Sequence, residues 1–191
     1  MGKHTFVLFS FITLVGAAFA QAPVSLFDGK TLQGWKAITC EAEVVDGAIL
    51  IKGGNGVLLA DKEYGDFIFE CDWKALNKEM WDSGVYFRCG LPPKNSHWPK
   101  DYQVNMRKGQ EGSISGADKT KAASLYKPGD WNHYKLTVKG KTAELEFNGV
   151  PAWSRDGIEP ATGHLCLQAE VPGGGQFLFR KITIVDLAAK K

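Results

Sequence analysis

Hydrophobic and polar residues alternate along several short segments of the chain. In residues 66–74, Phe67, Phe69, Cys71 and Trp73 occupy every second position, and mostly polar residues lie between them. A period of two is typical of a β-strand that buries one face. The same pattern predicts further strands at residues 85–89, 101–107, 134–139, 143–147, 164–170 and 177–185.

The segment 85–89 has a clear division between its two faces. Its alternation predicts that Val85, Phe87 and Cys89 are buried, and that Tyr86 and Arg88 point the other way. The pair Gly140-Lys141 lies between two alternating segments and predicts a hairpin.

Glycine-containing sequences separate the predicted strands. They lie at residues 46–47, 53–56, 64–66, 127–130, 148–149 and 172–175. Each is a place where the chain can turn, and no long stretch shows helical periodicity. We therefore predict an all-β sandwich or barrel, formed by a single domain over residues 21–191.

Two segments beside the 85–89 strand lack alternation and are predicted to be long loops. Residues 75–82 end in Glu-Met-Trp-Asp, and residues 91–100 contain His97, Trp98 and three prolines. Long ordered loops on a β scaffold often carry function, although their aromatic residues can also pack onto the sheet edge. Near the start of the domain, Phe27 and Trp35 are predicted to pin the first segment onto the sandwich.

The first 20 residues have the features of a secretory signal peptide. A basic residue, Lys3, precedes a continuous apolar stretch, and Ala18-Phe19-Ala20 forms an A-x-A cleavage site. The apolar stretch is short for a membrane span and no cysteine accepts a lipid at the cleavage point. We predict cleavage after Ala20, export to the periplasm or the medium, and no membrane insertion.

Charge and cysteine content narrow the possible partners. The net charge is only +2 and there are no long runs of like charge, so a nucleic-acid partner is not expected. Cys40, Cys71, Cys89 and Cys166 lack the C-x-x-C spacing of zinc sites. In an exported protein they are buried thiols or form a disulfide, and the sequence allows three pairings.

Polar residues alternate with apolar ones on four of the predicted strands, and these polar faces are the candidate site. They are Glu70 and Asp72; Tyr86 and Arg88; Gln103, Asn105 and Arg107; and His164, Gln168 and Glu170. If they share one sheet, they present carboxylates, amides, an arginine and an imidazole to the same ligand. Such a mixture suits sugar hydroxyls, which both donate and accept hydrogen bonds. The alternative is that each strand has an ordinary solvated face.

Motifs of other enzyme classes are absent. The chain has no G-x-S-x-G, H-E-x-x-H or Walker sequence, and Gly173-Gly174-Gly175 is not followed by a helical pattern that could bind an anion. Serine hydrolases, zincins and nucleotide-binding proteins are therefore not indicated.

Taken in order, several segments resemble the 3-keto-disaccharide hydrolase domain family over nearly the whole mature chain. They are SLFDGKTLQGW, YGDFIFECDWK, DSGVYFR, DYQVNM, PGDWNHYKLTVKGKTAELEFNGV and HLCLQAEVPGGGQFLFRKITI. The resemblance implies a two-sheet antiparallel β-sandwich, the concanavalin A-like lectin/glucanase jelly roll. It also implies cleavage of glycosides whose sugar carries a ketone at carbon 3. In that reaction a base removes the hydrogen on carbon 2, the glycosidic oxygen leaves, and water adds to the enone.

The resemblance suggests a role for each candidate residue. Asp72 or Glu170 is expected to be the base and Arg88 the stabiliser of the enolate oxygen. Substrate-binding residues are expected to be Glu70, Tyr86, Gln103, Asn105, His164 and Gln168. Two positions depart from the family pattern, since Gln103 stands where many members have glutamate and Asp82 where many have asparagine.

Other functions stay open at this point. A divalent cation near Glu70, Asp72 and Glu170 is possible, but no acidic loop has cation-binding spacing. The same sandwich could be a non-catalytic carbohydrate-binding module, with Trp81, Trp98 and Trp153 as the sugar platform, or a cell-envelope interaction domain without a sugar site. For the enzyme and for the carbohydrate-binding module, the expected partner is a small carbohydrate.

Overall fold

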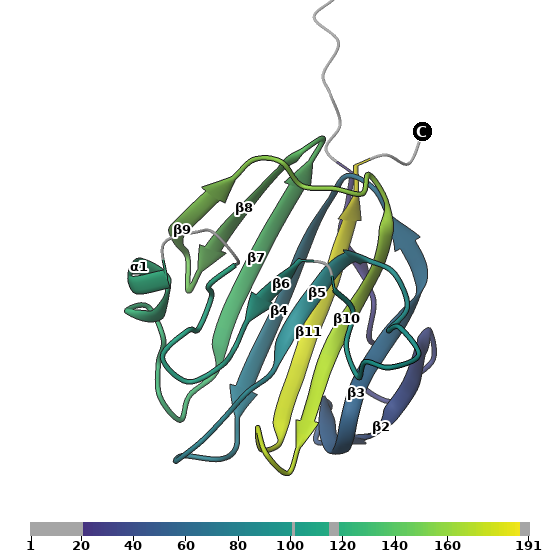
Figure 1. Cartoon of the computed structure of the whole chain (residues 1–191), viewed down its shortest axis with the longest axis vertical. Helices are drawn as coiled ribbons and strands as arrows, with labels where there is room; N and C mark the ends of the chain where they lie inside the picture. Colours follow the sequence, from purple (N-terminus) through teal and green to yellow (C-terminus); the bar gives the residue numbers. More distant parts are fainter. Residues whose placement is uncertain (1–20, 101, 115–118, 188–191) are drawn as a thin grey trace, which may run out of the picture.

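The computed structural model describes residues 21–100, 102–114 and 119–187, and strands dominate this part of the chain (Figure 1). The strands are β1 Val24–Ser25, β2 Trp35–Val45, β3 Ala48–Tyr64, β4 Phe67–Ala75, β5 Gly84–Cys89, β6 Gln103–Asn105, β7 Asn132–Lys139, β8 Thr142–Phe147, β9 Val150–Arg155, β10 Gly163–Val171 and β11 Phe177–Asp186. One short helix, α1 Lys119–Ala123, precedes β7. The predicted all-β class is confirmed, and the predicted signal peptide lies outside the described residues.

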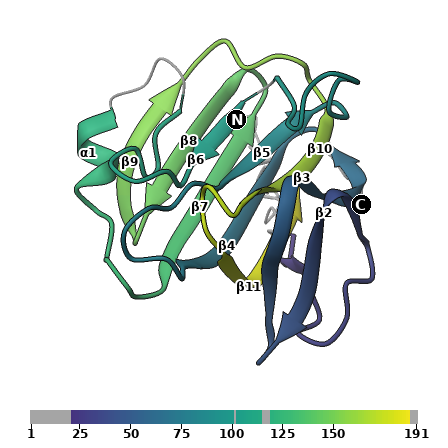
Figure 2. The ribbon, with the colours of Figure 1, turned by 60° about the horizontal axis from the view of Figure 1, so that its bottom comes forward.

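The described strands form one antiparallel sheet with the order β6-β5-β10-β3-β11-β4-β7-β8-β9. The long strand β3 joins its two halves, because residues 54–64 pair with β10 and residues 49–51 pair with β11. The sheet curls so that β5 and β6 lie across from β4 and β7 (Figures 1 and 2). The hydroxyl of Tyr134 in β7 donates to the carbonyl of Asn105 in β6 at 2.9 Å. The two layers expected from the sequence are thus parts of one curled sheet.

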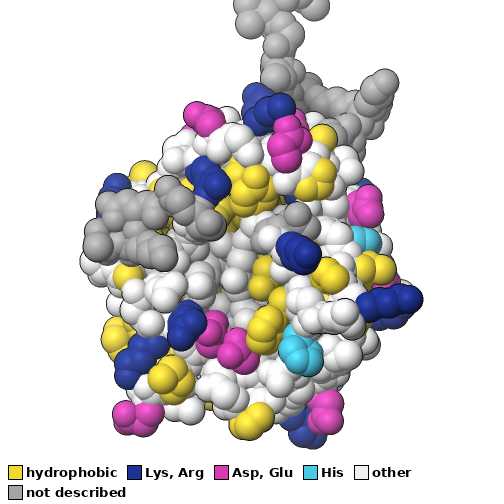
Figure 3. Space-filling view, in the orientation of Figure 1, with side chains coloured by type: hydrophobic (Ala, Val, Ile, Leu, Met, Phe, Trp, Pro, Cys, Tyr) yellow, Lys and Arg dark blue, Asp and Glu magenta, His cyan; other side chains and the backbone are white. Residues whose placement is uncertain are grey.

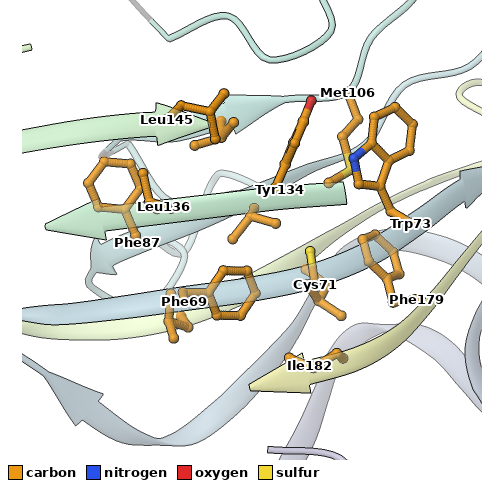
Figure 4. Packing of buried hydrophobic residues seen from close by; sticks show 14 of the residues in the cluster. Phe69, Cys71, Trp73, Phe87, Met106, Tyr134, Leu136, Leu145, Phe179 and Ile182 are labelled. Atoms are coloured by element: carbon orange, nitrogen blue, oxygen red, sulfur yellow. The ribbon is translucent and has the colours of Figure 1, made fainter. Parts of the chain in front are cut away.

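The hydrophobic core fills the inside of the curl (Figure 4). The predicted inward residues of β4, which are Phe67, Phe69, Cys71 and Trp73, are all at most 1% exposed. The Trp73 ring stacks on Tyr126 with centroids 5.6 Å apart. Burial of one large apolar side chain contributes about 1.5–3 kcal/mol, so this row alone holds β4 firmly in the sheet.

The turn predictions are mostly confirmed, with one error. Residues 46–47, 64–66, 140–141 and 148–149 connect consecutive strands, but residues 53–56 lie inside β3. Gly54 has a φ of +87°, and a Cβ atom at this position would lie 2.6 Å from the carbonyl oxygen of Thr39. The glycines here allow the close approach of β2 at a register shift rather than a chain reversal.

Strand β5 departs from the predicted alternation at its end. Arg88 has a positive φ of 45° and is 1% exposed instead of facing solvent. Cys89 does not join Val85 and Phe87 in the main core, but lies with Tyr86 in a smaller cluster. A residue with positive φ breaks the alternation of side chains, so the predicted faces of Arg88 and Cys89 are wrong, although the predicted burial of Cys89 is confirmed.

The first segment is attached as predicted. Phe27 and Trp35 are buried, and the Trp35 indole donates to the carbonyl of Leu26 at 2.7 Å. β1 pairs with β11 and so fixes the start of the described chain beside its end. No helix within the described ranges has the length and hydropathy needed to cross a membrane.

Candidate functional site

Four of the candidate residues lie together on the outer face of β5, β6 and β10. Val85, Val104 and Leu167 point into the core, so their sequence neighbours face outward. On this outer face a hydrogen-bonded chain runs from Gln103 through Gln168 to Glu170. The Gln103 amide donates to Oε1 of Gln168, and Gln168 Nε2 donates to Glu170 Oε2 at 3.0 Å.

Asp82 brings a second carboxylate to this face. It directly precedes Ser83 and β5, and its side chain is only 16% exposed. Burial, together with the negative charge of Glu170, raises the pKa of Asp82 to about 6, and the positive charge of Arg107 partly opposes this rise. Arg107 Nε lies 3.5 Å from Asp82 Oδ2. Glu170 is therefore close enough to disfavour the charged form of Asp82.

Tyr86 lies on the same face and is 6% exposed. Burial raises the pKa of its phenol, and the charges of Asp82 and Glu170 act in the same direction. The phenol consequently stays neutral and keeps a proton to donate. Its hydroxyl forms no hydrogen bond within the part of the chain that the structure describes.

Two glycines make this arrangement possible. A Cβ atom on Gly84 would collide with the side chain of Gln103, which lies directly over it. A Cβ atom on Gly174 would lie 2.8 Å from the Cβ of Asp82. The Asp82 amide also donates to the carbonyl of Gly174 at 2.8 Å. The turn after β10, predicted only as a connection, thus holds Asp82 beside Glu170.

We call this group the Asp82–Glu170 site. It consists of Asp82, Tyr86, Gln103, Arg107, Gln168 and Glu170. On the face that carries β5, β6 and β10, Figure 3 shows acidic side chains gathered next to basic and hydrophobic ones. Asn105 borders the site, because it pairs with Gly84 and its Oδ1 accepts from the Arg107 amide at 2.7 Å.

Sequence reasoning did not assign Asp82 to the site, and it gave Arg107 no role there. A usable signal was present for Asp82, which precedes Gly84 and Tyr86 at intervals of two residues and so continues their face. Arg107 belongs to the predicted polar face of the 101–107 segment, but no pattern indicated its carboxylate partner.

Glu70 and Asp72 occupy a different place, on the outer face of β4. His133 lies between them, with Nδ1 2.9 Å from Asp72 Oδ1 and Nε2 3.3 Å from Glu70 Oε2. Arg180 and Lys181 also reach Asp72, at 3.2 and 3.0 Å. Burial acts to raise the pKa of Asp72, but hydrogen bonds from His133 and Lys181 outweigh it, and the pKa is lowered.

This second group does not join the Asp82–Glu170 site. In the sheet, β11 and β3 separate β4 from β10. The carboxylate of Asp72 already has three cationic or histidine partners, which is the pattern of a charge network that supports the sheet.

Arg88 and His164 also lie elsewhere. The Arg88 guanidinium donates to the carbonyls of Gly65 and Gly140 at 2.9 and 2.6 Å, and to Asp66 at 2.9 Å. It thereby ties two turns together at one end of the sheet. His164 contacts the carbonyl of Ala60 at 3.0 Å, and six residues of strand place it roughly 20 Å from Glu170 along β10.

The tryptophans considered as a sugar platform all make contacts within the protein. Trp98 donates from its indole to the Ala169 carbonyl at 3.1 Å and covers the face beside the site. Trp81 donates to Glu111 at 3.0 Å, and Trp153 to the Gly112 carbonyl at 2.5 Å. None of the three is an open, exposed ring.

The described residues also limit where a metal ion could bind. No three histidine, cysteine, aspartate or glutamate side chains among them are grouped to hold one. The suggested set of Glu70, Asp72 and Glu170 is not assembled, because Glu170 lies in the other half of the sheet.

Comparison with known proteins gives one family. The family described as the 3-keto-alpha-glucoside-1,2-lyase-like domain matches residues 22–185. No curated protein matches the chain at a significant level.

Solved structures of several proteins share the fold. A protein of Parabacteroides distasonis ATCC 8503, titled "Putative glycosyl hydrolase", is similar with a TM-score of 0.73 and 20% identity, over 87% of this chain and 100% of that one. The carbohydrate binding module CBM66 from Bacillus subtilis is similar with a TM-score of 0.61 and 16% identity, over 79% and 94% of the two chains. A Bacillus subtilis protein of unknown function with a galectin-like fold gives a TM-score of 0.54 and 10% identity, over 78% and 86%.

Proposed function

Because the chain belongs to the 3-keto-alpha-glucoside-1,2-lyase-like domain family, we propose that it acts on carbohydrates and cleaves 3-keto-glycosides. The observation that carries this proposal is the pair of carboxylates, Asp82 and Glu170, beside a neutral phenol and a guanidinium on the outer face of β5 and β10.

The chemistry of a 3-keto-glycoside explains why such a group is suitable. The ketone acidifies the hydrogen on carbon 2, so that a carboxylate can remove it and leave an enolate. The enolate expels the glycosidic oxygen from carbon 1, and water then adds to the enone. The protein must supply a base, a donor for the enolate oxygen and an acid for the leaving group.

The residues of the Asp82–Glu170 site can be assigned to these three tasks. We assign Glu170 as the base, because Gln168 holds its carboxylate in place. Asp82 is the acid for the leaving oxygen, since a pKa of about 6 keeps part of it protonated near neutral pH. The Tyr86 phenol and the Arg107 guanidinium stabilise the enolate oxygen. Two nearby carboxyl groups in different environments can thus serve as the acid and the base.

The departures from the family pattern fit this assignment. Where many members have glutamate, this chain has Gln103, which donates to Gln168 instead of ionising. Where many members have asparagine, it has Asp82. The site thus loses one carboxylate and gains another on the same face, so it keeps the groups that acid–base catalysis requires.

A carbohydrate-binding module is the second candidate. Its support is the fold shared with CBM66 and a cavity of about 320 Å³ whose lining includes Trp81, Tyr126, Asn77 and Lys78. An aromatic wall with amide and ammonium groups suits a sugar ring. In this case the protein would bind sugars without turnover.

Incubation of the protein with a 3-keto-disaccharide separates the two candidates. Release of the free aglycone or second sugar is followed by chromatography, and sugar binding is measured by calorimetry. The proposal expects turnover that is lost in Glu170→Gln and kept in the matched control Asp72→Asn. Binding without turnover by the unchanged protein would reject the enzyme in favour of the module.

We also propose that the protein is exported and cleaved after Ala20, from the signal-peptide pattern of residues 1–20. The test is N-terminal sequencing of the protein recovered outside the cytoplasm of a bacterial host. A mature chain that begins at Gln21 supports the proposal, and an intact chain retained in the cytoplasm contradicts it.

A further inference from the structure

Two of the four cysteines lie in contact on neighbouring strands. Cys89 ends β5 and Cys166 lies in β10, and their sulfur atoms are 3.1 Å apart. Cys89 is 1% exposed and Cys166 is fully buried. The other two cysteines are placed differently, since Cys71 lies in the main core and Cys40 is half-buried in β2.

The local backbone brings these two thiols to the same side of the sheet. The positive φ of Arg88 turns Cys89 to the outer face, and the pairing of β5 with β10 shifts register between His164 and Cys166. Without these irregularities, the alternation would place Cys89 on the core side with Phe87. Both deviations from regular strand geometry therefore act at the same place and create the contact.

We propose that Cys89 and Cys166 are a redox modification site and are joined by a disulfide bond in the mature protein. The oxidant is a small-molecule disulfide such as oxidised glutathione, or a disulfide-exchange protein of an oxidising compartment. One cysteine thiolate attacks the oxidant and forms a mixed disulfide, releasing one thiol. The second cysteine then displaces the other thiol, so the protein loses two protons and two electrons and the oxidant is reduced to two thiols.

The structure allows this bond with a small movement. A disulfide has a sulfur–sulfur distance of about 2.05 Å, so the two sulfurs need to approach by about 1 Å. The pair is 77 residues apart in sequence, and the bond would link two neighbouring strands that both carry the Asp82–Glu170 site. Tyr86 packs in the same small cluster as both cysteines, together with Val57 and Leu59. The bond would thus lie directly beside the phenol of the site.

The buried position also predicts when the bond forms. The hydrogen bond with Cys89 and burial both raise the pKa of the Cys166 thiol, which disfavours the attacking thiolate in the folded protein. Exchange is then expected during folding, when the thiols are open to the oxidant.

The test is thiol mapping of the full chain refolded with either oxidised glutathione or dithiothreitol. Free thiols are alkylated after denaturation, and the modified peptides are identified by mass spectrometry. The expected result with glutathione is alkylation at Cys40 and Cys71 only, a peptide pair joined through Cys89 and Cys166, and a mass lower by two hydrogen atoms. Four alkylated cysteines, a bond that involves Cys40 or Cys71, or a lasting glutathione adduct would overturn the proposal.

Thermal unfolding gives a second measurement on the same samples. A bond that closes so long a loop should raise Tm by roughly 5–15 °C over the reduced protein. The shift should disappear in the Cys89→Ser/Cys166→Ser protein and persist in the control Cys40→Ser. An equal Tm for oxidised and reduced protein, or a shift that survives the double substitution, also counts against the proposal. Neither measurement depends on turnover of a sugar.

Discussion

Replacement of Asp82 by asparagine should make the folded protein more stable at neutral pH while it slows release of the aglycone. The raised pKa of Asp82 means that the folded state holds the proton more tightly than the unfolded state, where the pKa is 3.8. As the pH rises from about 4 to 6, the unfolded carboxylate ionises first, and this ionisation favours unfolding. Asparagine keeps the shape of the side chain but cannot ionise, so it avoids this cost.

The size of the effect follows from the two pKa values. The folded and unfolded pKa values differ by about 2, and a difference of 1 corresponds to about 1.4 kcal/mol. The free energy of unfolding of Asp82→Asn at pH 7 should therefore exceed that of the unchanged protein by at most about 3 kcal/mol. For a chain of this size that corresponds to a rise in Tm of roughly 6–12 °C. At pH 3.5, where the carboxyl is mostly protonated in both states, the two proteins should have nearly the same stability.

Urea unfolding of both proteins, followed by tryptophan fluorescence between pH 3.5 and 7.5, measures the difference. The difference in free energy of unfolding between the two proteins should be near zero at the acid end, increase between about pH 4 and 6, and then stay constant. If Asp82→Asn is less stable than the unchanged protein at pH 7, or if the difference does not vary with pH, the assignment of Asp82 as a buried carboxylate with a raised pKa is refuted.

Three further substitutions test the roles of other residues. Asp72→Asn should lower the free energy of unfolding by about 1–2 kcal/mol at pH values above the pKa that Asp72 has in the unfolded state. This loss should disappear as the pH falls through the lowered pKa of the folded state. Urea unfolding at pH 3 and 7 measures it, and an equal loss at both pH values would argue against the charge network. Arg88→Met should lower the free energy of unfolding by about 2–4 kcal/mol, because the carbonyls of Gly65 and Gly140 and the Asp66 carboxylate lose their donor; a Tm within two or three degrees of the original, by circular dichroism, would show that these bonds are not important. Gly84→Ala should keep the strand content but reduce turnover by roughly tenfold or more, because the added methyl displaces Gln103; unchanged kinetics would exclude Gln103 from the site.

Much of the fold could be predicted because its signals are local. In β4, β7, β8 and β11, one row of apolar side chains packs into the core, and the period of two reports this directly. The turn sequences at residues 46–47 and 148–149 have the positive φ angles that glycine and its preceding residue supply.

The errors concern features that depend on distant parts of the chain. Residues 53–56 contain three glycines because β2 approaches them closely, and a sequence cannot distinguish this cause from a turn. The left-handed backbone of Arg88 occurs where β5 meets a register shift in β10. Neither partner strand is visible in the local pattern.

The candidate site was predicted only in part for the same reason. Glu70, Asp72 and Glu170 have the same alternating pattern, and nothing local shows which polar face becomes a site. The selection comes from the curl of the sheet and from the turn after β10, which holds Asp82 next to Glu170. The resemblance to the family pointed to Tyr86 and Gln103, which the structure brings together with Gln168 and Glu170, while Asp72 lies on another face.

The central claim, that Glu170 removes the hydrogen on carbon 2 of a 3-keto sugar, is tested most directly by isotope exchange. A 3-keto-glycoside is incubated with the protein in D₂O, and deuterium at carbon 2 is followed by NMR. We expect rapid incorporation with the unchanged protein and with Asp72→Asn. Glu170→Gln should give none above the background, and Asp82→Asn should still exchange but release the aglycone slowly. Exchange by Glu170→Gln at the rate of the unchanged protein, or its loss in Asp72→Asn, would contradict the account.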